Sequence, residues 1–273
     1  MPFIDWLKIV VLGIIEGITE WLPISSTGHM ILFDAFVPLP LEPAFKEMFL
    51  VVIQLAAILA VILVFFTKLN PFSPSKTKIE RKNTWDTWFK IIIGCLPAAI
   101  IGLPLDDFME KHFFNYFVVA LMLILYGILF IVIENRHDPK KETIHSFPEL
   151  SYKTAFLIGC FQALALVPGT SRSGATILGA LILGTSRYIA TEFSFFLSVP
   201  VMLGASLLKV YKFGLNFTGL EIWIMIVGSV VAFIVSLLAV KFLLNYIKKN
   251  DFKPFGWYRI IVGIIVLIAF QFK

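Results

Sequence analysis

The sequence predicts an all-α integral membrane protein with six transmembrane helices plus two re-entrant hairpins, each made of a broken helix, arranged in an inverted repeat. Hydrophobic residues make up 59% of the 273 residues and charged residues 15%, whereas soluble domains are about half apolar and a quarter charged. Six apolar segments approach or reach the ~20 residues that cross a bilayer. Two shorter apolar segments are interrupted by dense polar stretches that align with each other.

The first polar stretch, Glu16–His29, reads EGITEWLPISSTGH and divides the N-terminal apolar segment. Residues 3–22 are mostly apolar, Pro23 then ends the helix, and apolar character returns only over residues 30–38. Neither piece comfortably spans a membrane alone. We therefore expect a hairpin that enters and leaves on one side, with its turn buried in protein or lining a cavity.

The second half of the chain repeats this plan. Apolar residues 154–167 and 177–183 flank the stretch PGTSRSGAT and predict a second re-entrant hairpin. Each half thus has one hairpin and three long apolar segments. The six expected spans are Glu47–Phe66, Trp88–Leu105, Phe113–Ile133, Glu192–Leu208, Leu220–Leu244 and Trp257–Phe272.

A shift of about 146 residues aligns the two polar stretches. It places Gly13 on Gly159, Glu16 on Gln162, Ser25 on Ser171, Thr27 on Ser173 and Gly28 on Gly174. We expect a single transmembrane domain over 1–273, with repeats over about 1–135 and 150–273. An odd number of crossings per repeat makes the repeats inverted, as in many transporters.

Loop charges predict the orientation. Lysine and arginine gather in the expected loops after the first, third and fifth spans, which places those loops in the cytoplasm. The segment 105–113, expected to be a loop, is acidic, and both termini are then outside. The net charge of +5 is spread over short loops, so topology explains it better than nucleic-acid binding. Cys95 and Cys160 lie in apolar runs and indicate neither a disulfide nor a metal site.

The first polar stretch carries a constellation of reactive side chains. Glu16 and Glu20 are four residues apart, so they share a helical face and could hold a divalent cation, or one could act as a base. The hydroxyls of Ser25, Ser26 and Thr27, on a turn that Gly28 permits, suit an anionic oxygen, although they could merely satisfy the broken backbone. His29, which follows Gly28, could donate a proton or shape the pocket.

Arg172 is the most informative residue of the second stretch. It lies between Ser171 and Ser173, where the membrane interior is expected, and its planar fork matches phosphate oxygens. An arginine opposite paired glutamates suits phosphoryl transfer, in which positioning and charge neutralisation supply most of the catalysis.

These motifs resemble the undecaprenyl-diphosphate phosphatase family of bacitracin-resistance type. The resemblance rests on (E/Q)xxxE at Glu16–Glu20, PxSSTGH at Pro23–His29 and PGxSRSxxT at Pro168–Thr176, and it runs from the first hairpin to the last span. It implies hydrolysis of undecaprenyl diphosphate to the phosphate carrier used in peptidoglycan synthesis, and hence bacitracin resistance. It also implies a Mg²⁺ or Ca²⁺ cofactor and a site open to the outer face of the bacterial cytoplasmic membrane.

The resemblance also implies roles for residues. Glu16 and Glu20 would serve the metal and the proton chemistry, and Ser26 would be the nucleophile or a phosphate ligand. His29 would assist proton transfer. The diphosphate would be held by Arg172, Ser171, Ser173 and Thr176. Whether Ser26 or water attacks, and whether the protein forms a homodimer, stay open.

Two other functions compete with this one. A lipid transporter or flippase would share the inverted repeat, but it does not need so many reactive groups. The acid-phosphatase-like lipid phosphatases have motifs that SSTGH and TSR echo. The chain downstream of Arg172 lacks the histidine nucleophile that those enzymes require.

Overall fold

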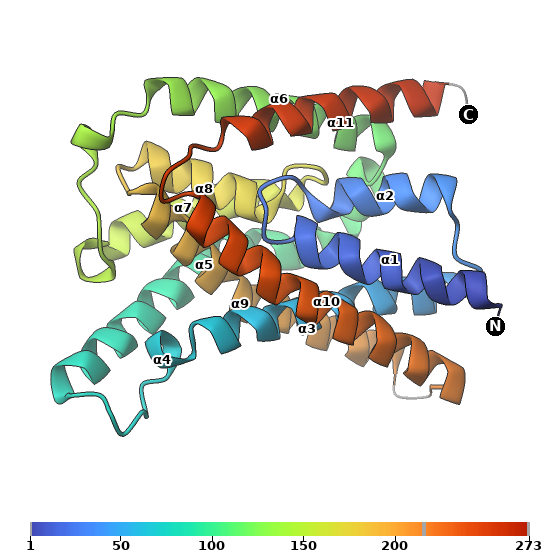
Figure 1. Cartoon of the computed structure of the whole chain (residues 1–273), viewed down its shortest axis with the longest axis horizontal. Coiled ribbons are helices and arrows are strands. Elements are labelled where there is room, and N and C mark those ends of the chain that lie inside the picture. The colour runs from blue at the N-terminus through green and yellow to red at the C-terminus, as the bar shows by residue number, and fades with distance from the viewer. Residues whose placement is uncertain (1, 215–216, 272–273) are drawn as a thin grey trace.

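The computed structural model describes residues 2–214 and 217–271, and within these ranges the chain is built from helices (Figure 1). The α-helices are α1 (Phe3–Thr19), α2 (Ser26–Phe36), α3 (Pro43–Val64), α4 (Phe66–Leu69), α5 (Lys78–Phe113), α6 (Tyr116–Arg136), α7 (Tyr152–Ala163), α8 (Arg172–Ile182), α9 (Arg187–Phe213), α10 (Gly219–Tyr246) and α11 (Lys253–Gln271). Three short 3₁₀ helices lie at Pro139–Lys141, Phe147–Glu149 and Leu164–Leu166.

Six of these helices are long and apolar enough to cross a membrane, which confirms the expected number of spans. They are α3, α5, α6, α9, α10 and α11. Each overlaps most of its predicted segment, with ends moved by a few residues in most cases. The predicted last residue of the sixth span, Phe272, lies outside the described residues.

Helix α5 differs most from the prediction. It has 36 residues and continues through Pro97 and Pro104, so the segment 105–113, expected to be a loop, is helical. An internal proline removes one backbone hydrogen bond and bends a helix without having to end it. At the other end, Thr77 and Glu80 form a capping box that starts α5 ten residues before Trp88.

Close helix packing places the first polar stretch. Helix α1 packs on α10, which in turn packs on α3, while α7 packs on α5 and α11 lies along α6 (Figure 1). A Cβ atom added to Gly13 would lie 2.9 Å from the Gly228 carbonyl oxygen, and one on Gly17 would lie 2.9 Å from that of Ala232. Only glycine allows α1 to approach α10 this closely.

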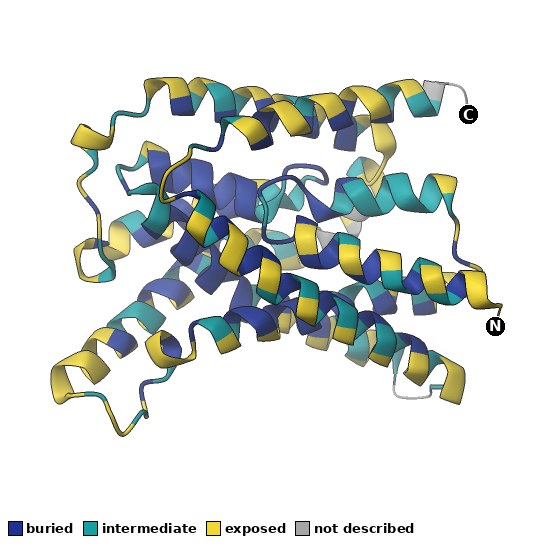
Figure 2. Ribbon diagram, in the orientation of Figure 1, coloured by how far each residue is buried: buried dark blue, intermediate teal, exposed yellow. Residues whose placement is uncertain are grey.

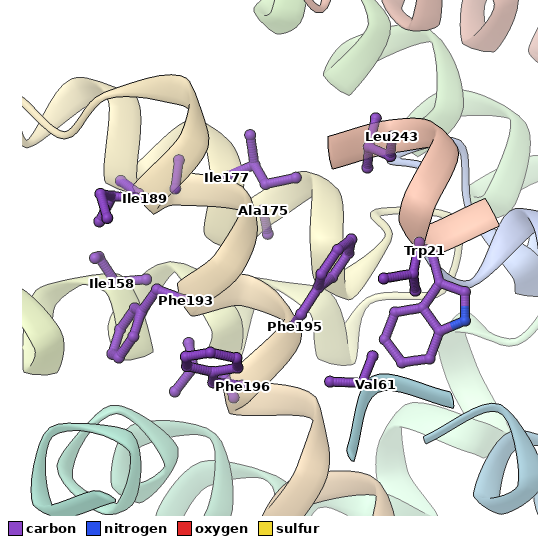
Figure 3. Packing of buried hydrophobic residues seen from close by; sticks show 14 of the residues in the cluster. Trp21, Val61, Ile158, Ala175, Ile177, Ile189, Phe193, Phe195, Phe196 and Leu243 are labelled. Carbon is purple, nitrogen blue, oxygen red and sulfur yellow. The ribbon is translucent and has the colours of Figure 1, made fainter. Parts of the chain in front are cut away.

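Burial increases toward the middle of the molecule. The outer faces of the long helices are exposed and rich in large apolar side chains, as a lipid-facing surface requires, whereas α8 and the turns before α2 and α8 are mostly buried (Figure 2). Beside those turns, the buried Trp21 meets Phe195 of α9 edge to face at 5.3 Å (Figure 3). The turns are therefore anchored in the hydrophobic core.

Candidate active site at two broken helices

The two helix breaks end in the same unusual backbone conformation. Ser25 and Ser171 have φ angles of 74° and 72°, which non-glycine residues seldom adopt. Each is an N-cap whose Oγ accepts a hydrogen bond from a glycine amide: Gly28 N at 3.4 Å and Gly174 N at 3.2 Å. Residues that the shift of 146 aligns therefore share one local geometry. Such strain is common where a turn presents functional groups.

Glu20 joins the two breaks. Its carboxylate accepts a hydrogen bond from Ser26 Oγ at 2.9 Å through one oxygen and from Arg172 Nη2 at 3.0 Å through the other. Glu20 and Ser26 are buried, and the Arg172 side chain is 11% exposed. The structure thus brings together the acid, the hydroxyl and the cation that the sequence predicted as a constellation, from stretches 152 residues apart.

Arg172 is fixed by a second contact. Its Nη1 donates to the backbone oxygen of Ser194 on α9 at 2.7 Å. Its buried Nε has no hydrogen-bond partner among the described residues. The predicted substrate ligand Thr176 instead supports this arrangement, because its hydroxyl bonds Ser194 Oγ at 2.7 Å and the Arg172 carbonyl at 2.9 Å. The guanidinium is therefore held by Ser194 of α9 and by Glu20, which directly follows α1. Some of its N–H groups remain available as hydrogen-bond donors.

Two adjoining cavities open beside this cluster. One, of about 170 Å³, is lined by polar groups that include Glu20, Ser26 and Arg172. The other, of about 520 Å³, is mainly apolar, and Glu16 lies in its wall. Five residues line both cavities: Ser26, Thr27, Gln54, Ala165 and Pro168. A polar head and an apolar tail could therefore be bound side by side.

Glu16 is the residue best suited to a cation. It is 1% exposed, and neither of its carboxylate oxygens has a hydrogen-bond partner in the described part of the chain. A buried carboxylate without partners is costly unless a cation or proton compensates it. No group of three or more histidine, cysteine, aspartate or glutamate side chains is placed to share a metal within the described residues. Glu16 fits a cation that takes its other ligands from phosphate and water, as Mg²⁺ does.

His29 lies apart from this cluster. One ring nitrogen, Nδ1, is 2.7 Å from the Ser25 carbonyl oxygen, so it donates there, and Nε2 then accepts from the Tyr258 hydroxyl at 2.7 Å. The ring stacks on Tyr258 and lines neither cavity. In this position His29 holds the strained Ser25 backbone, and its predicted role in proton transfer stays a prediction.

The remaining predicted residues divide into cavity wall and scaffold. Ser25, Thr27 and Ser171 line the polar cavity. Ser173 bonds the Glu20 carbonyl at 3.3 Å and Ser171 Oγ at 3.2 Å, which ties the second turn to the first. Gly28 packs its backbone on Leu123 of α6, where an added Cβ would come within 3.1 Å of a side-chain carbon.

Sequence reasoning missed Arg259, which is fully buried in α11 and connects both turns. Its guanidinium donates to the carbonyl oxygens of Pro23 at 3.1 Å, Gly169 at 2.8 Å and Thr170 at 2.8 Å, and it lies 5.6 Å from the centre of the Tyr126 ring. It therefore donates hydrogen bonds to backbone carbonyl groups that have no helical partner because each helix is broken there. The signal was available, because an arginine inside an apolar span usually has a function.

Sequence reasoning also missed Gln54, which lies on α3 in the wall of both cavities. It stands in the otherwise apolar run VVIQLAAI, and a polar side chain in such a run is a weaker form of the same signal.

The fold and the site together define a polytopic membrane protein with a buried acid, hydroxyl and arginine cluster between two broken helices. The chain belongs to the bacitracin resistance protein BacA family, which it matches over residues 9–265. It is 58% identical to an undecaprenyl-diphosphatase of Enterococcus faecalis over 98% of both chains. It is also 58% identical to an undecaprenyl-diphosphatase of Desulfitobacterium hafniense, over 99% of this chain and 98% of that one. Undecaprenyl-diphosphatase 1 of Clostridium acetobutylicum is 58% identical over 99% of both chains.

Proposed function

We propose that this chain hydrolyses undecaprenyl diphosphate to undecaprenyl phosphate and inorganic phosphate. The observation that carries the proposal is the bridge from Ser26 through Glu20 to Arg172, beside a polar cavity that adjoins an apolar one. The family and the names of its similar members give the substrate. The reaction recycles the lipid carrier for peptidoglycan synthesis and confers resistance to bacitracin.

The bridge supports a proposed role for each group. Glu20 is placed to accept the proton of Ser26 Oγ, whose oxygen then attacks the terminal phosphorus while the anhydride bond breaks and undecaprenyl phosphate leaves. Water would then hydrolyse the phosphoserine and release inorganic phosphate. Alternatively, Glu20 activates a water that attacks directly, and Ser26 positions the phosphate. Arg172 neutralises the phosphoryl oxygens in either case.

A divalent cation, Mg²⁺ or Ca²⁺, is part of this proposal. Glu16, with Glu20, would hold it, and the unpartnered Glu16 oxygens support that assignment. When bound, such an ion neutralises charge on the diphosphate. Glu20 already accepts hydrogen bonds from Ser26 and Arg172, so Glu16 would be the principal protein ligand of the cation.

The proposed topology comprises two re-entrant hairpins in an inverted repeat within one transmembrane domain. Helices α1 and α2 have 17 and 11 residues, and α7 and α8 have 12 and 11. At ~1.5 Å per residue all four are shorter than a ~30 Å bilayer core. With lysine-rich loops in the cytoplasm, both termini and the larger cavity lie toward the outer face of the bacterial cytoplasmic membrane.

The decisive experiment uses Ser26→Ala. Loss of one hydrogen bond costs about 0.5–1.5 kcal/mol, so the variant should bind the lipid diphosphate within about tenfold of wild type. Loss of a nucleophile removes many powers of ten from the chemical step, so single-turnover phosphate release should nearly vanish. Release within tenfold of wild type would indicate attack by water. A wild-type protein that releases no phosphate but moves lipid across vesicles would refute the phosphatase and favour a flippase.

A further inference from the structure

The larger cavity has a charged rim formed by three helices. Lys46 of α3 pairs with Asp34 of α2, and Lys209 of α9 pairs with Glu47 of α3. All four residues line the cavity that adjoins the polar site. Among the described residues that line either cavity, the cationic side chains are Arg172 at the polar end and these two lysines at the rim.

At the rim, the cations lie deeper than their partners. The side chains of Lys46 and Lys209 are 24% and 27% exposed, whereas those of Asp34 and Glu47 are 44% and 49% exposed. The lysine is therefore the more buried partner in both ion pairs. Ion pairs this exposed contribute only ~0–1 kcal/mol, so a phosphate anion inside the cavity can displace the carboxylates.

The Lys209–Glu47 pair joins α9 to α3, and the ion pair at the other end of these two helices has a different environment. Helices α3 and α9 pack together, and at their other end Lys68 pairs with Glu192 at 2.6 Å. Glu192 is buried and Lys68 lines neither cavity. Lys68 lies on the short helix α4 that follows α3, and of these two lysine–glutamate pairs only the Lys209 pair has its cation in a cavity wall.

We propose that Lys46 and Lys209 form a second anion site, a transit site for phosphate groups that move between the cavity mouth and Arg172. The inference rests on the proposed phosphatase function and adds a route by which phosphate groups reach and leave the active site. A lysine ammonium is a hydrated point charge on a flexible stem, which suits transient contact, whereas the planar fork of Arg172 suits fixed binding. Asp34 and Glu47 compete with the anion and therefore limit how tightly the site holds it.

The test compares Lys46→Met, Lys209→Met and the double variant with Lys8→Met. Lys8 is a matched control, because it is 21% exposed, pairs with Asp5 at 3.0 Å and lines neither cavity. The first readout is the inhibition constant of inorganic phosphate, and the second is KM for the lipid diphosphate. We expect the double variant to raise one or both about fivefold or more, and Lys8→Met to change neither.

The two readouts separate the sources of phosphate. A raised inhibition constant alone shows a site for free phosphate, and a raised KM alone shows a site for the lipid head group. If both stay within twofold of wild type, the transit site is refuted.

A second double variant, which should strengthen phosphate inhibition, distinguishes loss of the anion site from damage to the fold. Asp34→Asn with Glu47→Gln removes the competing carboxylates, so inorganic phosphate should inhibit more strongly, which loss of folding cannot mimic. Unchanged or weaker inhibition would contradict the site. Calorimetric titration of the lipid-free protein with inorganic phosphate reads the same site without turnover. It therefore remains informative even if the wild type hydrolyses no lipid.

Discussion

Replacement of Arg259 should impair catalysis although the residue lines neither cavity. In Arg259→Lys the charge is kept but the planar fork is lost. One ammonium cannot reach the Pro23 carbonyl of the first turn and the Gly169 and Thr170 carbonyls of the second as the guanidinium does. The two turns would then lose the side chain that joins their backbones.

The free-energy cost of Arg259→Lys can be estimated from these hydrogen bonds. Hydrogen bonds that involve a charged group contribute ~1.5–3 kcal/mol each, and two of the three are short, at 2.8 Å. If Arg259→Lys forfeits one or two of them, the cost is about 1.5–6 kcal/mol. A displacement of ~1 Å between Glu20 and Arg172 would lower turnover by about 10²-fold.

The assay measures turnover, KM and thermal unfolding of the detergent-solubilised protein. The control is Arg187→Lys, because Arg187 forms a two-pronged ion pair with the buried Glu134 and lines neither cavity. Both variants should unfold at lower temperature, but only Arg259→Lys should lose turnover in the fraction that stays folded. Equal turnover per folded molecule in the two variants would refute the positioning role.

Four further predictions concern the site and the topology. Glu20→Gln should lower turnover at least ~10²-fold, measured as phosphate release at equal folded yield, because it removes the base and weakens the hold on Arg172. Glu16→Gln should raise the concentration of Mg²⁺ or Ca²⁺ needed for half-maximal activity, and an unchanged metal titration would exclude Glu16 as a ligand. Arg172→Lys should lose most activity because the fork contacts both Glu20 and Ser194, so unchanged kinetics would show that it does not grip phosphate. The topology can be tested with single cysteines in a protein whose Cys95 and Cys160 have been replaced. Cysteines introduced at Ser75 and Lys140 should resist an impermeant thiol reagent in intact cells, while one at Lys111 should be labelled. The reverse labelling pattern would show that the topology is inverted.

The spans and the breaks could be predicted because each depends on local sequence. An apolar run of membrane length predicts a span, and Pro23 or Gly169 beside serines predicts a break. The extent of α5 could not be read from hydropathy, because eight of its first ten residues are polar or charged and only the Thr77–Glu80 capping box marks its start. Hydropathy also ended the predicted span at Leu105, whereas the helix continues to Phe113.

The site was only partly predictable, because its contacts are long-range. Glu20, Ser26 and Arg172 could be proposed together from motif chemistry, and the structure places them within hydrogen-bond distance. The orientation of His29 toward Tyr258 depends on how α11 packs beside α2, which no local pattern encodes. Arg259 was missed for the same reason, since its partners lie 89 to 236 residues away in sequence.

The contact between Arg172 and Glu20 also bears on how the site meets its substrate. The contact to Glu20 and the contact to Ser194 each use one N–H group, so Nη1 and Nη2 each keep a second N–H group for a phosphate oxygen. A phosphate that accepts from these groups would lie in the polar cavity, whose wall also includes Glu20 and Ser26. Arg172 could therefore hold a phosphate next to Ser26 without releasing Glu20, which keeps its hydrogen bond from the Ser26 hydroxyl.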